Sequence, residues 1–191
     1  MENKKNRCPW CEGNPLYQKY HDLEWGVPLY DDLKLFEFLI LETFQSGLSW
    51  ITVLRKRENF RSAFDQFDYE KIACYRDEKI NALLDNEGII RNKQKIKATV
   101  NNAQRFIAIR QNYGSFSRYI WEFVGGKPLH NNFNSLEEIP SKTSLSDTIS
   151  KDLKQKGFQL VGPVVVYALM QATGMVNDHL VNCYRYQELS H

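Results

Sequence analysis

Residues 144–163 read SLSDTISKDLKQKGFQLVGP, and this stretch does most to decide the fold. Ser144 and Asp147 have the spacing of a helix capping box. The helix that they begin ends in KQKG, where Gly157 suits the left-handed position that follows a helix. Pro163 then fits the first turn of a second helix. Two helices joined by a glycine-bearing turn resemble a helix-hairpin-helix motif.

A turn of this kind can hold a DNA phosphate. Its glycines leave backbone N–H groups bare at the start of a helix, where they bind an anion without reading base sequence. The turn alone fits an ordinary pair of helices with a glycine stop equally well. Lys151, Lys154 and Lys156 beside it favour the DNA-binding interpretation slightly.

The rest of the chain shows helical periodicity nearly throughout. Apolar residues at three- and four-residue spacings predict a strong helix from Asp32 to Gln45. We find no period-two strand pattern and no hairpin turn signal, and Gly125–Lys142 is the best candidate for a long loop. The sequence therefore predicts an all-α fold, in one domain over residues 1–191. Further helices are expected at about 50–56, 59–67, 78–84, 92–111, 116–124 and 163–173, with a last short helix over VNDHLVNCYR (176–185).

The composition permits a nucleic-acid partner without demanding one. The 191 residues are 42% hydrophobic and 13% aromatic, enough for a real core, and their formal charge of +2 is also that of an ordinary soluble surface. Apolar runs fall short of the ~20 residues that span a bilayer. The polar N-terminus has no apolar signal region, so we expect a cytoplasmic protein with no membrane contact, whose cysteines are thiols or metal ligands.

Cysteine and histidine residues form a half-site near each end of the chain. His179 and Cys183 are four residues apart, which on a helix places both on one face. Cys8, Cys11 and His21 lie near the N-terminus. The two half-sites together would suit a metal clasp, whereas His179 and Cys183 alone fit a surface histidine and a buried thiol. A redox role for CPWC would need a preceding strand, which is missing, and on spacing alone Cys8 and Cys11 compete as ligands.

Glu42 is the most informative single residue because apolar neighbours surround it on its helix. A buried carboxylate is costly unless it meets a partner or lines a pocket. The simpler alternative is a helix-end glutamate that pairs with a nearby Arg or Lys. Core packing is the default explanation for the dense aromatic residues of the first fifty positions. A carboxylate ringed by aromatic faces, however, would suit a flat, positively charged heterocycle.

Together these stretches resemble the 3-methyladenine DNA glycosylase I family. YHDLEWG and GLSWITVLRKRENF are highly specific, and the matches run in order from Cys8 to Cys183. The matching stretches are RCPW, NPLYQKYHDLEWGVP, LFEFLILE, QSGLSWITVLRKRENFRSAF, GIIRNKQKI, SLSDTISKDLKQKGFQLVGP and MVNDHLVNC. The resemblance implies a helix-hairpin-helix glycosylase-like fold. It also implies a monomeric base-excision repair enzyme that hydrolyses the N-glycosidic bond of 3-methyladenine in alkylated double-stranded DNA, releasing the free base and leaving an abasic site.

The resemblance also implies roles for individual residues. One structural Zn²⁺ would join the chain ends, with Cys11 outside its ligand set. The implied zinc ligands are Cys8, His21, His179 and Cys183. The implied base pocket has Glu42 as its catalytic carboxylate, Tyr20 and Trp50 framing the adenine, and Trp10, Tyr17 and Trp25 around them. The implied DNA contacts are Gly47, Leu48 as an apolar wedge, and the hairpin residues Gly157, Val161 and Gly162.

Two positions depart from the wider helix-hairpin-helix glycosylase superfamily. An aspartate stands two residues before the histidine there, whereas this chain has Asn177, so no catalytic aspartate is assigned. Asp178 is instead a candidate partner for His179 or a group that positions water. Pro163 occupies the place of a nucleophilic lysine, so no Schiff-base lyase activity is expected.

Overall fold

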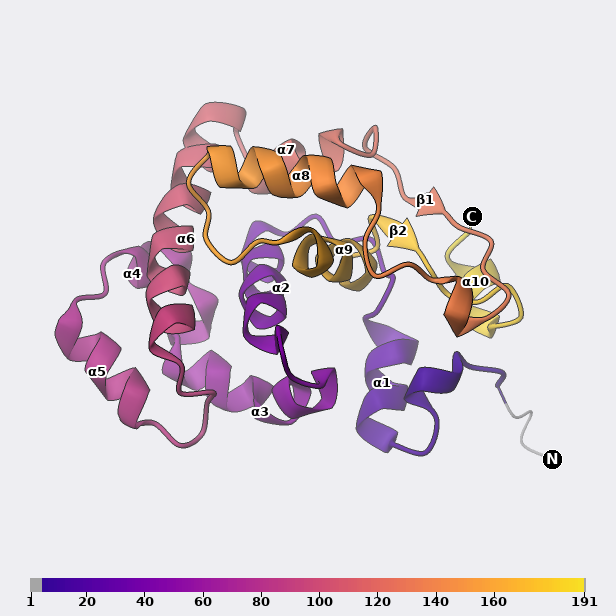
Figure 1. Cartoon of the computed structure of the whole chain (residues 1–191), viewed down its shortest axis with the longest axis horizontal. Helices are drawn as coiled ribbons and strands as arrows, with labels where there is room; N and C mark the ends of the chain where they lie inside the picture. The colour runs from indigo at the N-terminus through magenta and orange to yellow at the C-terminus, as the bar shows by residue number, and fades with distance from the viewer. Residues whose placement is uncertain (1–4, 191) are drawn as a thin grey trace.

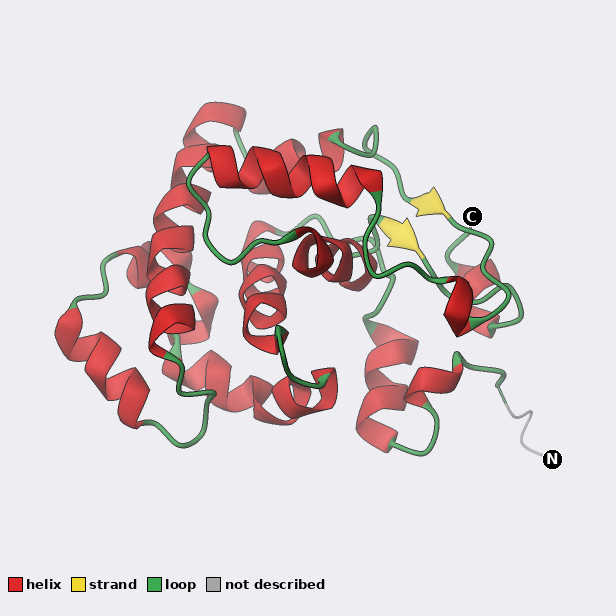
Figure 2. Cartoon of the chain, in the orientation of Figure 1, coloured by secondary structure: helices red, strands yellow, loops and turns green. Residues whose placement is uncertain are grey.

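The computed structural model describes residues 5–190, and helices make up most of them (Figures 1 and 2). The all-α prediction is confirmed in its main point. The helices are α1 (Pro15–Leu23), α2 (Asp32–Gln45), α3 (Trp50–Ala63), α4 (Tyr69–Ala73), α5 (Asp77–Asp85), α6 (Lys93–Tyr113), α7 (Phe116–Glu122), α8 (Ser144–Gln155), α9 (Pro163–Ala172) and α10 (Tyr184–Glu188). Short 3₁₀ helices are η1 (Pro9–Cys11), η2 (Asp65–Phe67) and η3 (Leu136–Glu138), and the strands are β1 (Leu129–His130) and β2 (Val176–Asn177).

Helix α2 forms the centre of the molecule. Every side chain from Leu35 to Phe44 is buried, as expected for a helix that is apolar on all sides. Helices α3, α6, α7 and α9 pack around it, and α8 lies across α9 (Figure 1). Asp31 caps its N-terminus by accepting a hydrogen bond from the Lys34 N–H. The predicted bounds of this helix, Asp32 to Gln45, agree with the structure.

The hairpin between α8 and α9 has the predicted stop and start signals. Gly157 has a φ of +87°, a backbone conformation that favours glycine, and a Cβ there would lie a tight 3.0 Å from the Arg105 side chain. Pro163 is in the first turn of α9. The predicted capping box is shifted, because Thr143 is the N-cap and exchanges hydrogen bonds with Ser146.

Two predicted helices, at 50–56 and 59–67, are instead one continuous helix, α3, that ends at Ala63. Asp65, Gln66 and Phe67 then have positive φ values, which stop the helix and turn the chain. The short helices α1 and α4 were not among the predicted ranges.

The prediction of a last helix over residues 176–185 is wrong for residues 176–183. Val176 and Asn177 pair in parallel with Leu129 and His130 of the long loop. The Asn177 side chain then accepts a hydrogen bond from the His179 N–H, and α10 begins only at Tyr184. Strands of two residues are too short to produce a period-two pattern, which is why the sequence showed none.

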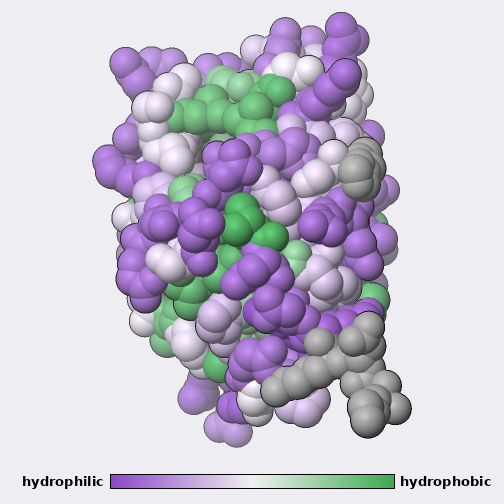
Figure 3. All heavy atoms as spheres, turned by 90° about the vertical axis from the view of Figure 1, so that its right-hand side faces the viewer, coloured by the Kyte–Doolittle hydropathy of each residue, from purple (hydrophilic) through white to green (hydrophobic). Residues whose placement is uncertain are grey.

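The N-terminal and C-terminal segments lie on the same side of the molecule (Figure 1). They touch directly, since the Tyr184 N–H donates to the Asn6 carbonyl at 2.9 Å. Seen from this side, hydrophobic side chains form small separate patches among hydrophilic ones (Figure 3). Within residues 5–190, no helix has the length and apolar character needed to span a membrane.

Candidate functional site

Four metal-ligating side chains from the two ends of the chain meet in the interior. Cys8, His21, His179 and Cys183 are all buried, and one ligand atom from each lies within 4.8 Å of the others. Cys183 Sγ is 3.4 Å from His21 Nε2 and 3.6 Å from His179 Nδ1. His179 and Cys183 converge through an extended turn and not through the helical face expected from their spacing.

The surroundings of the two histidines fit a metal site. His21 Nδ1 lies 2.9 Å from Asp22, whose carboxylate also binds Arg7, and His179 Nε2 lies 3.0 Å from the Trp25 carbonyl. These outer contacts direct the other ring nitrogens toward the cysteines, as is usual for metal-binding histidines. Against the effect of burial, hydrogen bonds with Cys8 and then with the imidazoles lower the pKa of the Cys183 thiol. The cluster therefore suits a four-coordinate metal ion.

Cys11 is buried next to this cluster but does not belong to it. Its Sγ donates to the Cys8 carbonyl at 3.2 Å, within the 3₁₀ turn that the two cysteines share. The competition between Cys8 and Cys11 that spacing left open is thus settled by geometry in favour of Cys8.

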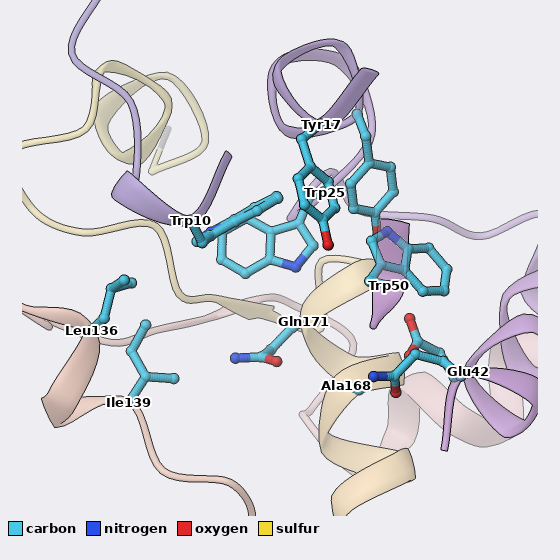
Figure 4. A pocket seen from close by; sticks show the side chains of 11 residues that line it. Trp10, Tyr17, Trp25, Glu42, Trp50, Leu136, Ile139, Ala168 and Gln171 are labelled. Carbon is cyan, nitrogen blue, oxygen red and sulfur yellow. The ribbon is translucent and has the colours of Figure 1, made fainter. Parts of the chain in front are cut away.

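Figure 4 shows a pocket of about 340 Å³. It lies next to the metal cluster, because its Trp10 and Trp25 rings contact the two histidines. All six residues predicted for a base pocket line it, and they come from η1, α1, α2, α3 and the turn after α1. The sequence did not point to the others. Ala168 and Gln171 are one turn apart on α9, a signal that helical periodicity could have given, whereas Leu136 and Ile139 belong to the long loop. The lining residues are Trp10, Tyr17, Tyr20, Trp25, Glu42, Gln45, Trp50, Leu136, Ile139, Ala168 and Gln171.

Aromatic rings form one wall of this pocket and support one another at their edges (Figure 4). Trp10 contacts Trp25 and Tyr17 in T-shaped pairs, with ring centroids 5.1 and 5.5 Å apart. Tyr20 and Trp50 are 5.4 Å apart. Edge contacts of this kind leave ring faces free for a flat ligand.

Glu42 faces the aromatic wall without a charged partner. Glu42 is only 4% exposed. Within residues 5–190, its carboxyl group forms neither an ion pair nor a hydrogen bond. Burial alone raises its pKa to about 8. Glu42 therefore does not form the helix-end ion pair that was the simpler alternative. The pocket instead holds a carboxyl group whose ionisation is costly.

Side chains of the metal cluster pack against side chains of the pocket wall. The Trp25 ring packs 4.6 Å from the His179 ring, and Trp10 lies 5.5 Å from His21. The cluster therefore holds the tryptophans of the pocket wall in place as well as joining the ends of the chain.

Hydrogen bonds from α6 hold the hairpin turn at residues 157–162 in place. Asn102 is fully buried and both donates to the Gln159 carbonyl, at 2.9 Å, and accepts from its N–H, at 2.8 Å. Leu160 has a φ of +57°, unusual for a side chain of this kind. The Val161 side chain is buried and its carbonyl accepts from Ser150. The N–H groups of residues 157–159 are bonded within the protein, so the backbone donors that the turn offers are those of residues 160–162.

Gly47 and Leu48 lie on the short turn between α2 and α3, which separates Glu42 from Trp50. Gly47 has a φ of +84°, and the Leu48 side chain is 40% exposed, unusual for a large apolar residue. The turn thus presents an apolar tip to the outside.

Asp178 does not contact His179 as the sequence suggested. It accepts hydrogen bonds from Tyr167 (2.6 Å), Gln171 (2.8 Å) and Asn131 (2.6 Å) and is 1% exposed. These bonds attach the Asp178 carboxylate to α9 and to the long loop. The Nε2 atom of His179 contacts the Trp25 carbonyl instead.

Known proteins resemble this chain along most of its length. The sequence profile of the methyladenine glycosylase family matches residues 10–186. DNA-3-methyladenine glycosylase 1 of Escherichia coli (strain K12) is 49% identical over 93% of this chain and 95% of its own. DNA-3-methyladenine glycosylase of Haemophilus influenzae is 47% identical over 93% and 96%. A solved structure of Staphylococcus aureus 3-methyladenine DNA glycosylase I, which concerns 3-methyladenine recognition, has a TM-score of 0.91 at 39% identity, covering 94% of this chain and 96% of that one.

Removing the carboxylate behind His21 should weaken the hold on a metal ion. We expect Asp22→Ala to lower metal affinity by about 10- to 100-fold, because the imidazole loses the contact that orients it. Competition with a chromogenic chelator measures this affinity directly. Asp77→Ala, an exposed aspartate on α5, is the matched control, and equal metal loss from both variants would contradict the prediction.

Cutting the support of the hairpin turn should destabilise the protein. Asn102→Ala leaves the N–H and the carbonyl of Gln159 without their buried partner, so the free energy of unfolding should fall by about 1–3 kcal/mol. Urea unfolding gives this value. Gln104→Ala removes only an exposed side chain bonded to the Ala73 carbonyl and should change it by less than about 0.5 kcal/mol. Equal effects would show that the buried contacts have no special importance.

Proposed function

Because the chain belongs to the methyladenine glycosylase family, we propose that it is a DNA repair enzyme that hydrolyses the N-glycosidic bond of 3-methyladenine. Its substrate is alkylated double-stranded DNA, and its products are the free base and an abasic site. The observation that carries this proposal is the buried, unpaired carboxyl group of Glu42 in a pocket walled by aromatic rings.

Charge on the damaged base explains both reactivity and selection. Methylation at N3 makes the base cationic within the nucleoside and therefore a good leaving group. Glu42 has a pKa raised to about 8 and is mostly protonated at neutral pH. A cationic base beside it lowers that pKa again, so the carboxyl group ionises as the base binds. Ordinary adenine is neutral and offers no such compensation, which disfavours its binding.

Aromatic faces supply the remaining recognition. The damaged base must leave the helical stack, at a cost that is smaller for a lesion than for a normal base pair. Tyr20 and Trp50 frame the base, and the rings of Trp10, Tyr17 and Trp25 complete the wall through stacking and cation–π attraction. Glu42 contacts the base, and no second carboxylate is assigned to activate water.

The DNA contacts come from two turns, one at residues 46–49 and one at residues 157–162. Leu48, next to Gly47, fills the gap that the displaced nucleotide leaves in the duplex, as apolar wedges do in other proteins that unstack DNA. The backbone N–H groups of Val161 and Gly162 bind a phosphate. Gly157, whose own N–H donates to the Lys154 carbonyl, shapes the turn and does not contact DNA through its N–H. Both contacts ignore base sequence, which suits an enzyme that meets lesions anywhere.

The metal ion is zinc in this proposal, one per chain. Two thiolates and two imidazoles are a common structural zinc set, and with four protein ligands no position remains for a reacting water. When bound, zinc supplies stability and not reaction chemistry. The enzyme acts as a cytoplasmic monomer.

The first test is release of bases from DNA treated with a methylating agent. We expect the parent protein to release 3-methyladenine, and Glu42→Gln to do so at least about 100-fold more slowly, since a group that stabilises charge in the transition state has effects of this size. Chromatography quantifies the free bases. Glu58→Gln, on the exposed side of α3, should retain the parent rate. No release by folded, metal-loaded parent protein would mean that the protein binds DNA without cleaving it.

Excision should also depend on pH through Glu42. The carboxyl group is protonated below its pKa of about 8, so kcat/KM should rise from pH 6 to about 8 and then level off. The Glu42→Gln profile should lack this rise. A rise of equal size in the variant would assign the titration to another group.

The free energy of unfolding, measured against pH, reports on the titration of Glu42 independently of activity. The folded protein holds the Glu42 proton more tightly than the unfolded chain does, where the ordinary pKa is 4.5, so this contribution to stability is lost as pH rises toward about 8. Glu42→Gln removes the loss, and its advantage in unfolding free energy should therefore grow across this pH range.

A further inference from the structure

The turn between Glu42 and Trp50 begins at a helix end that lacks ordinary capping. The last carbonyl groups of an α-helix have no partner within the helix. At the end of α2, the Gln45 carbonyl accepts from the Leu48 N–H at 2.7 Å, and the Gln45 side chain donates to the Leu48 carbonyl at 2.8 Å. These contacts lie inside the turn and do not attach it to the rest of the molecule.

Lys95, in the first turn of α6, makes that attachment. Its Nζ donates to the Phe44 carbonyl at 2.8 Å and to the Ser46 carbonyl at 2.6 Å. A cation at the C-terminal end of a helix also interacts favourably with the helix dipole. One amine therefore binds the last turn of α2 and the first residue after it, across about fifty residues of sequence.

Among the described residues, the Lys95 amine bonds only to the carbonyl groups at this helix end. Within residues 5–190, its amine forms no ion pair with a carboxylate, and the pKa of Glu42 responds to burial alone. Partial burial lowers the pKa of Lys95. Partial burial of a charged amine costs free energy, and the two hydrogen bonds to the Phe44 and Ser46 carbonyls offset that cost. The amine therefore fixes the position of these two carbonyls.

We propose that Lys95 is a positioning residue that holds the turn at residues 46–49 so that Leu48 can enter the duplex while the base occupies the pocket. This inference rests on the proposed function. Lys95 acts through the turn and touches neither the base nor the reacting atoms.

Of the pocket residues, only Gln45 lies between the two carbonyls, because Glu42 precedes them. The start of α3, which carries Trp50, is attached elsewhere, since the Ile51 N–H donates to the Tyr17 hydroxyl at 2.9 Å. The base pocket therefore depends less on the amine than the turn does.

A matched pair of variants tests this role. Lys97 is on the same helix, is exposed, and makes no side-chain hydrogen bond or ion pair within the described residues. Lys95→Met and Lys97→Met remove the same charge from the same region, but only Lys95→Met releases the turn. Any difference between them therefore reports on the two carbonyl contacts and not on attraction to DNA phosphates.

Two binding measurements separate the turn from the pocket. For duplex DNA carrying an abasic-site analogue, we expect Lys95→Met to weaken binding at least about tenfold relative to Lys97→Met. For free 3-methyladenine, followed by quenching of tryptophan fluorescence, the two variants should agree within about twofold. Lys95→Arg, whose guanidinium can donate to both carbonyls, should recover most of the duplex affinity. If Lys95→Met does not fold, Lys95→Gln and Lys97→Gln replace the methionine pair, because the shorter, uncharged side chain also loses the two contacts.

Other outcomes overturn the inference. Equal weakening of duplex binding by both methionine variants would make Lys95 an ordinary surface charge. Equal weakening of duplex and free-base binding by Lys95→Met would make it a support for the whole pocket. Failure of the parent protein to release 3-methyladenine from methylated DNA would contradict the proposed function instead, and the two results are read in separate assays.

Discussion

The burial of α2 on all sides is the constraint on which the rest of this structure depends. A helix with ten consecutive buried side chains must be enclosed by other elements, and α3, α6, α7 and α9 enclose it. One of those ten side chains is the carboxyl group of Glu42. The pocket is the gap in the enclosure through which this group can be reached, so core packing and ligand recognition are set by the same helix.

The metal cluster completes that enclosure on the side that helices leave open. Its two histidines pack against Trp10 and Trp25. The C-terminal segment that begins with β2 supplies His179 and Cys183, and the N-terminal segment supplies Cys8 and His21. The same C-terminal segment pairs with β1, and the loop after β1 carries Leu136 and Ile139 to the pocket. The pocket wall is thus assembled from the N-terminal part of the chain, from α9 and from the long loop, so no single local sequence describes it.

Local signals predicted the elements whose causes are local. Continuous apolar periodicity defined α2, and the Gly157 and Pro163 signals defined the hairpin, because each acts within a few residues. The metal ligands came from the family resemblance, since spacing alone left Cys11 in competition with Cys8. Residues 176–183 were assigned wrongly to a helix because their conformation depends on pairing with residues 129–130, far away in the sequence. Leu136 and Ile139 were missed for the same reason, whereas the isolation of Glu42 was suggested by its apolar neighbours.

The distance along the chain between the two halves of the metal cluster has a consequence for how the protein is made. Cys8 and His179 are separated by 171 positions, so the cluster can close only after nearly all of the described chain has been synthesised. At ordinary ribosomal speeds of about 5–20 residues per second, Cys8 and His21 wait roughly 10 to 30 s for their partners. During that interval the central helices can already pack, while the aromatic wall stays unfinished. Closure of the cluster is therefore a late step of maturation, and a nascent chain interrupted before His179 would retain a core without a completed pocket.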